Sequence, residues 1–129
     1  MKTRILTFIA AALIVITAVC GAICQHKTEK MCSEAAAILE KTVECSLSGD
    51  WEAAVFYAEE ANEFWRGQRR YIEFLFDHES GCRIAEGLAR IGVFAGGEAA
   101  DALCAEAETV RAHLEALSGY DRLTLGNIF

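Results

Sequence analysis

The chain opens with a long apolar run and continues with amphipathic stretches. Residues 5–23 carry no charge, and these 19 residues would form a helix about 28 Å long, close to the ~30 Å hydrocarbon thickness of a membrane. Beyond residue 27, apolar positions recur every three or four residues, which is the period of a helix with one buried face. The pattern predicts a membrane-length helix followed by a helical domain.

The helical domain divides into four predicted helices, over residues 28–46, 51–76, 78–95 and 98–117. Gly49 marks the first turn and Gly96 with Gly97 the third, and Asp50 and Asp77 are placed to cap the second and third helices. Residues 118–121 are expected to end the last helix. The positions expected in the core of the first helix are Met31, Ala35, Ile38, Thr42 and Cys45. The sequence therefore predicts an all-α protein: an N-terminal transmembrane helix followed by an antiparallel helical bundle of about four helices, arranged as two helical hairpins.

Two basic residues set the expected orientation. Lys2 and Arg4 precede the apolar run and favour the cytoplasmic side of a membrane. We therefore expect residues 1–24 to form a cytoplasmic start and a single-pass anchor in the cell membrane, and residues 25–129 to form an extracytoplasmic domain. A cleaved signal peptide is the alternative, since Cys20, Gly21 and Ala22 are small residues at which processing can occur, and the domain would then be secreted.

Charge narrows the choice of partners. The 129 residues include 12 basic and 19 acidic ones, a net charge of −7. Nucleic acid is therefore not an expected partner, because its binding relies on a basic surface. Without Lys2 and Arg4 the domain carries −9, and we expect so acidic a domain to be repelled by anionic headgroups and to stand off the membrane.

The junction before the third helix holds the residues that most resemble a chemical site. His78 lies between Asp77 and Glu79, and Cys82 follows one helical turn later, which places imidazole and thiol on one helix face. The favoured interpretation is that Asp77 caps the helix and its neighbours make polar contacts. A metal site or a pH-sensitive contact is the alternative. The chain has no CxxC or HExxH spacing, so no metal, cofactor or catalytic residue is predicted, and the protein is not expected to be an enzyme.

A dense basic patch interrupts the acidic domain. The segment WRGQRRY contains Trp65, Arg66, Arg69 and Arg70. Its simplest interpretation is a solvated helix face that pairs with nearby glutamates. The functional alternative is a docking site for an acidic partner, and the apolar end of the chain, with Ile128 and Phe129, is a second expected contact surface. The expected partner is an integral membrane protein or another copy of the chain.

Four cysteines fall in the presumed outer domain. Pairing of Cys45 with Cys104 and of Cys32 with Cys82 is the least strained arrangement in an up-and-down bundle. Free buried thiols are the equal alternative, because they pack as small hydrophobic groups. The sequence leaves both open.

Several short motifs resemble one bacterial family, called domain of unknown function 4363. They are GDWEAA at residues 49–54, Trp65, Asp77-His78-Glu79, Ile84 with LARI at 88–91, and LTLGNIF at 123–129. The resemblance implies a small membrane-anchored helical protein of Gram-positive bacteria with no established activity, associated with genes for small integral membrane proteins. This chain departs from the family at Ser80-Gly81-Cys82-Arg83, where an acidic and apolar pair is usual, which weakens a catalytic role for the motif.

The sequence leaves two function hypotheses. The first is a noncatalytic interaction protein, such as an accessory subunit of a membrane protein. The alternative is an extracytoplasmic sensor that binds a small ligand or metal near His78 and Cys82.

Overall fold

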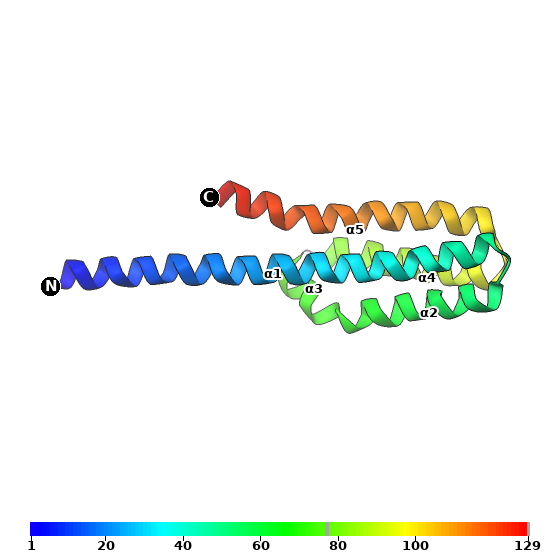
Figure 1. Cartoon of the computed structure of the whole chain (residues 1–129), viewed down its shortest axis with the longest axis horizontal. Coiled ribbons are helices and arrows are strands. Elements are labelled where there is room, and N and C mark those ends of the chain that lie inside the picture. Colours follow the sequence, from blue (N-terminus) through cyan, green and yellow to red (C-terminus); the bar gives the residue numbers. More distant parts are fainter. Residues whose placement is uncertain (77, 129) are drawn as a thin grey trace.

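The computed structural model describes residues 1–76 and 78–128, with side chains up to residue 119, and every regular element within them is a helix. The elements are α1 (Lys2–Leu47), α2 (Trp51–Gly67), α3 (Arg69–Leu75), α4 (His78–Gly96) and α5 (Ala100–Ile128). Helices α1, α2, α4 and α5 run up and down alternately, and α1 and α4 each pack against both α2 and α5 (Figure 1). The predicted all-α bundle with a long N-terminal helix is confirmed.

Helix α1 is continuous from the apolar run into the bundle, as the sequence allowed. Its N-terminal half projects beyond α2, α3 and α4, and only the C-terminal turns of α5 reach along part of it (Figure 1). The first buried residue of α1 is Thr28. The projecting half is long and apolar enough to cross a membrane. We call the end of the bundle next to it the proximal end, and the end holding the turns after α1 and α4 the distal end.

The buried face of α1 differs slightly from the predicted one. The positions that alternate by four and three are Thr28, Cys32, Ala35, Leu39, Thr42 and Ser46, and Met31 is also buried. Ile38 and Cys45, predicted for the core, are only half-buried. The hydroxyls of Thr42 and Ser46 donate to carbonyl oxygens of the preceding turn, at 3.0 and 2.7 Å, so these polar side chains are buried without an unpaired donor.

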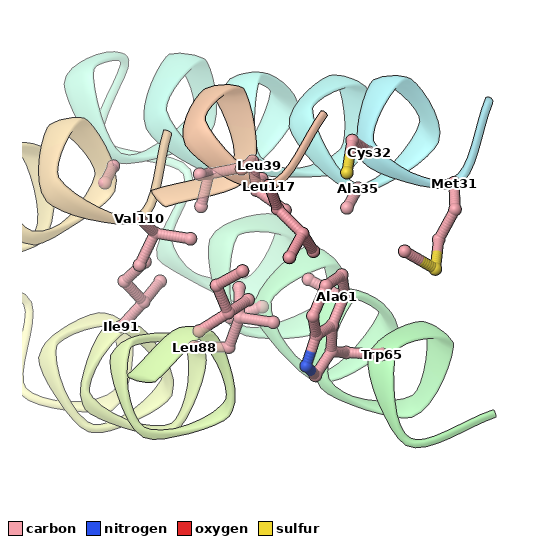
Figure 2. Close-up of a cluster of buried hydrophobic side chains, with 14 of the residues drawn as sticks. Met31, Cys32, Ala35, Leu39, Ala61, Trp65, Leu88, Ile91, Val110 and Leu117 are labelled. Carbon is pink, nitrogen blue, oxygen red and sulfur yellow. The ribbon is translucent and has the colours of Figure 1, made fainter. Parts of the chain in front are cut away.

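The core draws side chains from all four long helices. The cluster drawn in Figure 2 contains one or more side chains from each of these helices, such as Leu39 of α1, Ala61 of α2, Leu88 of α4 and Val110 of α5. Helix α2 contributes mostly alanines, which allow its neighbours to approach closely. At Gly87 the approach is closest, because a Cβ there would lie 2.4 Å from Cγ2 of Val110. Further buried apolar residues are Ile84, Ile91 and Ala95 in α4, and Leu103, Ala107, Leu114 and Leu117 in α5.

Of the two distal turns, the one after α1 follows local sequence signals, whereas the one after α4 places Glu98, and not a glycine, in the left-handed region at φ 55°. Gly49 has a φ of 79°, in the left-handed region that favours glycine, and the Asp50 carboxylate accepts from the Ala53 N–H at 3.2 Å. The predicted cap on α2 is therefore confirmed. Helix α4 ends at Gly96, near the predicted glycine stop.

The predicted single helix over 51–76 is wrong, because the chain bends at Gln68. There the backbone has φ −93° and ψ 0°, and the Gln68 N–H bonds to the Trp65 carbonyl, three residues back, at 3.1 Å. Gly67, a weak helix former, immediately precedes the bend. Helix α3 leaves the direction of α2 at this point and returns the chain toward α4 (Figure 1).

The predicted end of the last helix at residues 118–121 is also wrong, because α5 continues to Ile128. Ser118 and Gly119 line a hollow together with Glu29 and Cys32 of α1. These residues thus face the hollow between α5 and α1 as part of a continuing helix, and they do not form a turn. The C-terminal turns of α5 extend past α3 alongside the projecting half of α1 (Figure 1).

Candidate functional site

The proximal end of the bundle is built around the bend between α2 and α3. Trp65, in the last turn of α2, is buried, and its indole N–H donates to the Gly81 carbonyl of α4 at 3.3 Å. Ile72 of α3 is buried against the same region, and a Cβ at Gly81 would lie 2.8 Å from its Cγ2 methyl. An indole, an isoleucine and a bare glycine backbone therefore fix α3 against the start of α4.

A pocket of about 260 Å³ opens between α2, α3 and the first turns of α4. Its lining combines two sets of residues that the sequence suggested separately: the basic patch and the His78 junction. The lining residues are Trp65, Arg66, Arg69, Ile72, Glu73, His78, Gly81, Cys82 and Ala85. The pocket thus has an apolar interior and carries charged groups and a thiol.

The predicted pairing of imidazole and thiol on one helix face is present in this pocket. His78 Nε2 lies 3.3 Å from Cys82 Sγ, one turn of α4 apart. These two groups are too few for a structural metal site, and no group of three or more His, Cys, Asp or Glu side chains in the described residues is placed to hold a metal ion.

The arginines of the basic patch have different roles. Arg69 donates to Glu73 at 2.8 Å, and this hydrogen bond lowers the pKa of the Glu73 carboxyl and raises the pKa of Arg69. Arg66 lines the pocket and Arg70 does not, and both are exposed without an ion pair to any described residue. The interpretation as a face paired with glutamates therefore holds for Arg69 alone.

The other predicted site residues lie apart from the pocket. Glu79 pairs with Arg83 along the surface of α4, away from the His78 ring. Asp77 and Phe129 are outside the described residues, so the predicted cap by Asp77 stays a prediction. Ile128 ends α5, and its side chain is likewise not described. The two predicted partner surfaces, the basic patch and the chain end, belong to different elements.

No disulfide joins any two of the six cysteines, all of which lie within the described residues. Cys45 and Cys104 lie on the distal halves of their helices, and Cys32 and Cys82 on the proximal halves, as the predicted topology requires. This agrees with the free-thiol alternative.

Sequence reasoning missed a contact between α3 and α1. The Tyr71 hydroxyl donates to the Cys24 carbonyl at 2.8 Å and lies 2.7 Å from Thr28 Oγ1, and Thr28 Oγ1 is 2.9 Å from the same carbonyl. The Lys27 ammonium sits 4.4 Å from the centre of the Tyr71 ring. We call these four residues the Tyr71 latch. Thr28 in register with the apolar positions of α1 was the one available signal, because a buried hydroxyl needs a partner.

The Tyr71 latch fixes the level of α3 along α1. Cys24 is the last apolar residue before Gln25, so the tyrosine ring packs where the apolar half of α1 ends.

Comparison with known proteins gave no match to any family model, curated protein or solved structure. The resemblance to domain of unknown function 4363 stays a prediction.

Proposed function

We propose that the protein is a membrane-anchored, noncatalytic interaction protein, an accessory subunit of an integral membrane protein or a self-associating module. The observation that carries this proposal is the continuity of α1. One half of this helix contributes to the bundle core, and the other half is apolar and exposed along its whole length. Exposed apolar surface of this extent is unstable in water, and a bilayer covers it.

The placement of charge supports the proposed orientation. Lys2 and Arg4 stand before the apolar run, and a basic start favours the cytoplasmic side, which would put the bundle outside the cytoplasm. The bundle buries its own core, so it does not need a partner for folding. Surface residues therefore remain available for recognition.

Two kinds of exposed apolar surface could meet a partner. The projecting half of α1 presents large side chains around its circumference, such as Phe8 and Ile16. The distal half of the bundle exposes Leu47, Phe56 and Val93, from three different helices. A partner protein within the membrane would contact the first surface, and a partner with an outer domain would contact both.

In-cell photocrosslinking tests this function. A photoreactive phenylalanine replaces Phe8 in the projecting half or Phe56 on the bundle, which are 79% and 61% exposed, and the buried Phe76 serves as the matched control. We expect Phe8 and Phe56 variants to crosslink one protein reproducibly, with none captured from Phe76. The intact mass of the recovered chain shows whether residues 1–24 are retained.

The outcomes separate the alternatives. Crosslinking to one integral membrane protein identifies an accessory subunit, and crosslinking to the chain itself identifies self-association. A recovered chain that lacks residues 1–24 would overturn the anchored arrangement in favour of a secreted domain. Retention of the anchor without any protein crosslink from either position would overturn the interaction function.

A second candidate function rests on the pocket at the proximal end. Its apolar interior, exposed Arg66 and the contact between His78 and Cys82 suit a small amphipathic anion, which would make the bundle a ligand-binding or sensor domain. Native mass spectrometry of the purified full chain tests this directly. We expect an added mass that is lost in Cys82→Ser and His78→Ala and kept in Cys45→Ser, a half-buried thiol at the distal end. A spectrum without added mass would exclude a retained ligand or metal.

A further inference from the structure

The bundle distributes its charge unevenly along its long axis. Residues 40–60 and 96–108, which form the distal end, contain ten acidic residues and one lysine. Residues 25–33 and 61–75, which meet at the proximal end, contain five basic residues and three acidic ones. The net charge of the domain, which led us to expect that it stands off the membrane, therefore describes the distal end and not the surface closest to the bilayer.

Helix α3 lies at the level where a membrane spanned by α1 would end. The Tyr71 latch joins α3 to Cys24, the last apolar residue of α1 before Gln25, His26 and Lys27. The headgroup layer adds roughly 5–8 Å to each side of the hydrocarbon core, which is about one to one and a half turns of a helix. In Figure 1, α3 is the part of the α2–α4 side nearest the projecting half of α1. A membrane around that half would therefore place α3 at headgroup depth.

The side chains of α3 match this environment. Phe74 is 86% exposed, the largest exposure of any phenylalanine in the described residues. Tyr71 is half-buried and adds a second aromatic ring with a polar end, the type of side chain that gathers at membrane interfaces. Arg70 precedes it without an ion pair to a described residue, and Lys27 and Lys30 project from the adjoining turns of α1.

We propose that α3 is an interfacial foot, which inserts Phe74 among the lipids and binds anionic phospholipid headgroups through Arg70 and the neighbouring cations. This proposal rests on the proposed anchoring of α1. Basic side chains attract anionic headgroups over a Debye length, and an aromatic ring at the interface adds apolar contact. The acidic distal end is repelled by the same surface, so the charge of the bundle favours one orientation over the membrane.

Depth-dependent fluorescence quenching tests this contact. Full-length Phe74→Trp is reconstituted in vesicles of phosphatidylglycerol and phosphatidylcholine that contain lipids brominated on the acyl chain near the headgroup. The matched control is Phe56→Trp, on the exposed face of α2. Wild-type protein supplies the background from Trp51 and Trp65. We expect the added fluorescence of Phe74→Trp to fall by roughly two-fold and that of Phe56→Trp to stay unchanged.

A charge variant tests the headgroup assignment. Arg70→Glu should reduce quenching in the Phe74→Trp background, and Lys41→Glu, on the distal half of α1, should not. Quenching should also be weaker in pure phosphatidylcholine. Equal quenching with and without phosphatidylglycerol would overturn the role of anionic lipid.

Two further outcomes separate this proposal from the anchoring on which it rests. Carbonate extraction of the same vesicles reports whether the chain is embedded. A chain that is extracted overturns both the anchor and the foot. A chain that is retained while Phe74→Trp is unquenched overturns the foot alone, as does protection of residue 74 by a copurifying protein.

Discussion

The two ends of the bundle are closed in different ways. At the distal end, short turns join the helices, with Gly49 in a left-handed conformation and Asp50 capping α2. At the proximal end, α3 bridges α2 and α4 and is held by contacts to distant parts of the chain, from Tyr71 to Cys24 and from Trp65 to Gly81. The distal closure depends on neighbours in sequence, and the proximal closure depends on the packed bundle.

This difference indicates which end of the bundle is structural and which end carries the candidate functional surfaces. A turn set by local residues forms whatever the rest of the bundle does, so it serves as a structural closure. The proximal closure brings together a pocket, a basic cluster and an exposed aromatic ring beside the projecting half of α1. The contacts of the proximal end join groups up to 47 residues apart, including Cys24 at the end of the apolar half of α1. We therefore expect the packing of α3 to change when α1 shifts in the proposed membrane.

The largest effect should come from the middle of the bundle, where both ends depend on the same core. Leu88→Ala removes a side chain that is 1% exposed, and we expect it to lower the free energy of unfolding by about 2–5 kcal/mol. Circular dichroism during denaturation in detergent measures the loss, and hydrogen exchange should show both ends opening together. Opening of only one end would show that the two ends are separate folding units.

Asp50→Ala should weaken the distal end by about 1 kcal/mol, because the first turn of α2 loses its cap. Glu52→Ala is the matched control, since it removes a carboxylate from the same turn without removing the cap. Hydrogen exchange of residues 51–54 measures the effect. Faster exchange in α3 would contradict the independence of the two ends.

Tyr71→Phe should weaken the proximal end by about 1 kcal/mol, because the hydroxyl bonded to Cys24 is lost while the ring remains. Tyr57→Phe is the control, since Tyr57 is half-buried and its hydroxyl makes no hydrogen bond within the described residues. Exchange in α3 should accelerate in the first variant and stay unchanged in the second. Equal rates of exchange in α3 in the two variants would show that the Tyr71 hydroxyl does not hold α3 in place.

The smallest effects should come from two glycines of the proximal end, and they should differ in sign. Gly67→Ala meets nothing within 4 Å and improves the helix propensity, so we expect a gain of at most about 1 kcal/mol. Gly81→Ala brings a Cβ to 2.8 Å from the buried Ile72 methyl, and the cost of the shift of α3 that this requires should outweigh the same gain, so that this variant is slightly destabilised. Denaturation midpoints compare the two variants, and a stabilised Gly81→Ala would show that α3 is loosely packed.

The features that could be predicted from the sequence are those determined by residues close together in the chain. Apolar spacing identified the bundle and its seams, and Gly49 with Asp50 identified a turn and a cap, because each depends on residues close in the chain. Ser118 and Gly119 gave the wrong prediction, because a pair typical of turns lies here inside α5, which continues as a helix to Ile128.

The candidate site was predicted only in parts. One-turn spacing was enough to place His78 beside Cys82. It could not show that Arg66 and Arg69 line the same pocket, because that depends on the bend at Gln68 and on the packing of α3 against α4. The Tyr71 latch joins residues far apart in the chain, and such contacts have no periodic signal in one sequence.

The unbroken α1 would make the bundle a lever on the membrane segment proposed for its N-terminal half. Residues 24–47 would extend roughly 36 Å from the bilayer, so a change of 10° in tilt would move the distal end sideways by about 6 Å. Both α3 and the C-terminal turns of α5, which reach past α3 alongside the projecting half (Figure 1), would then lie against the membrane and resist tilting toward their own sides. A small reorientation within the membrane would therefore move the acidic distal end along the directions that α3 and α5 leave free.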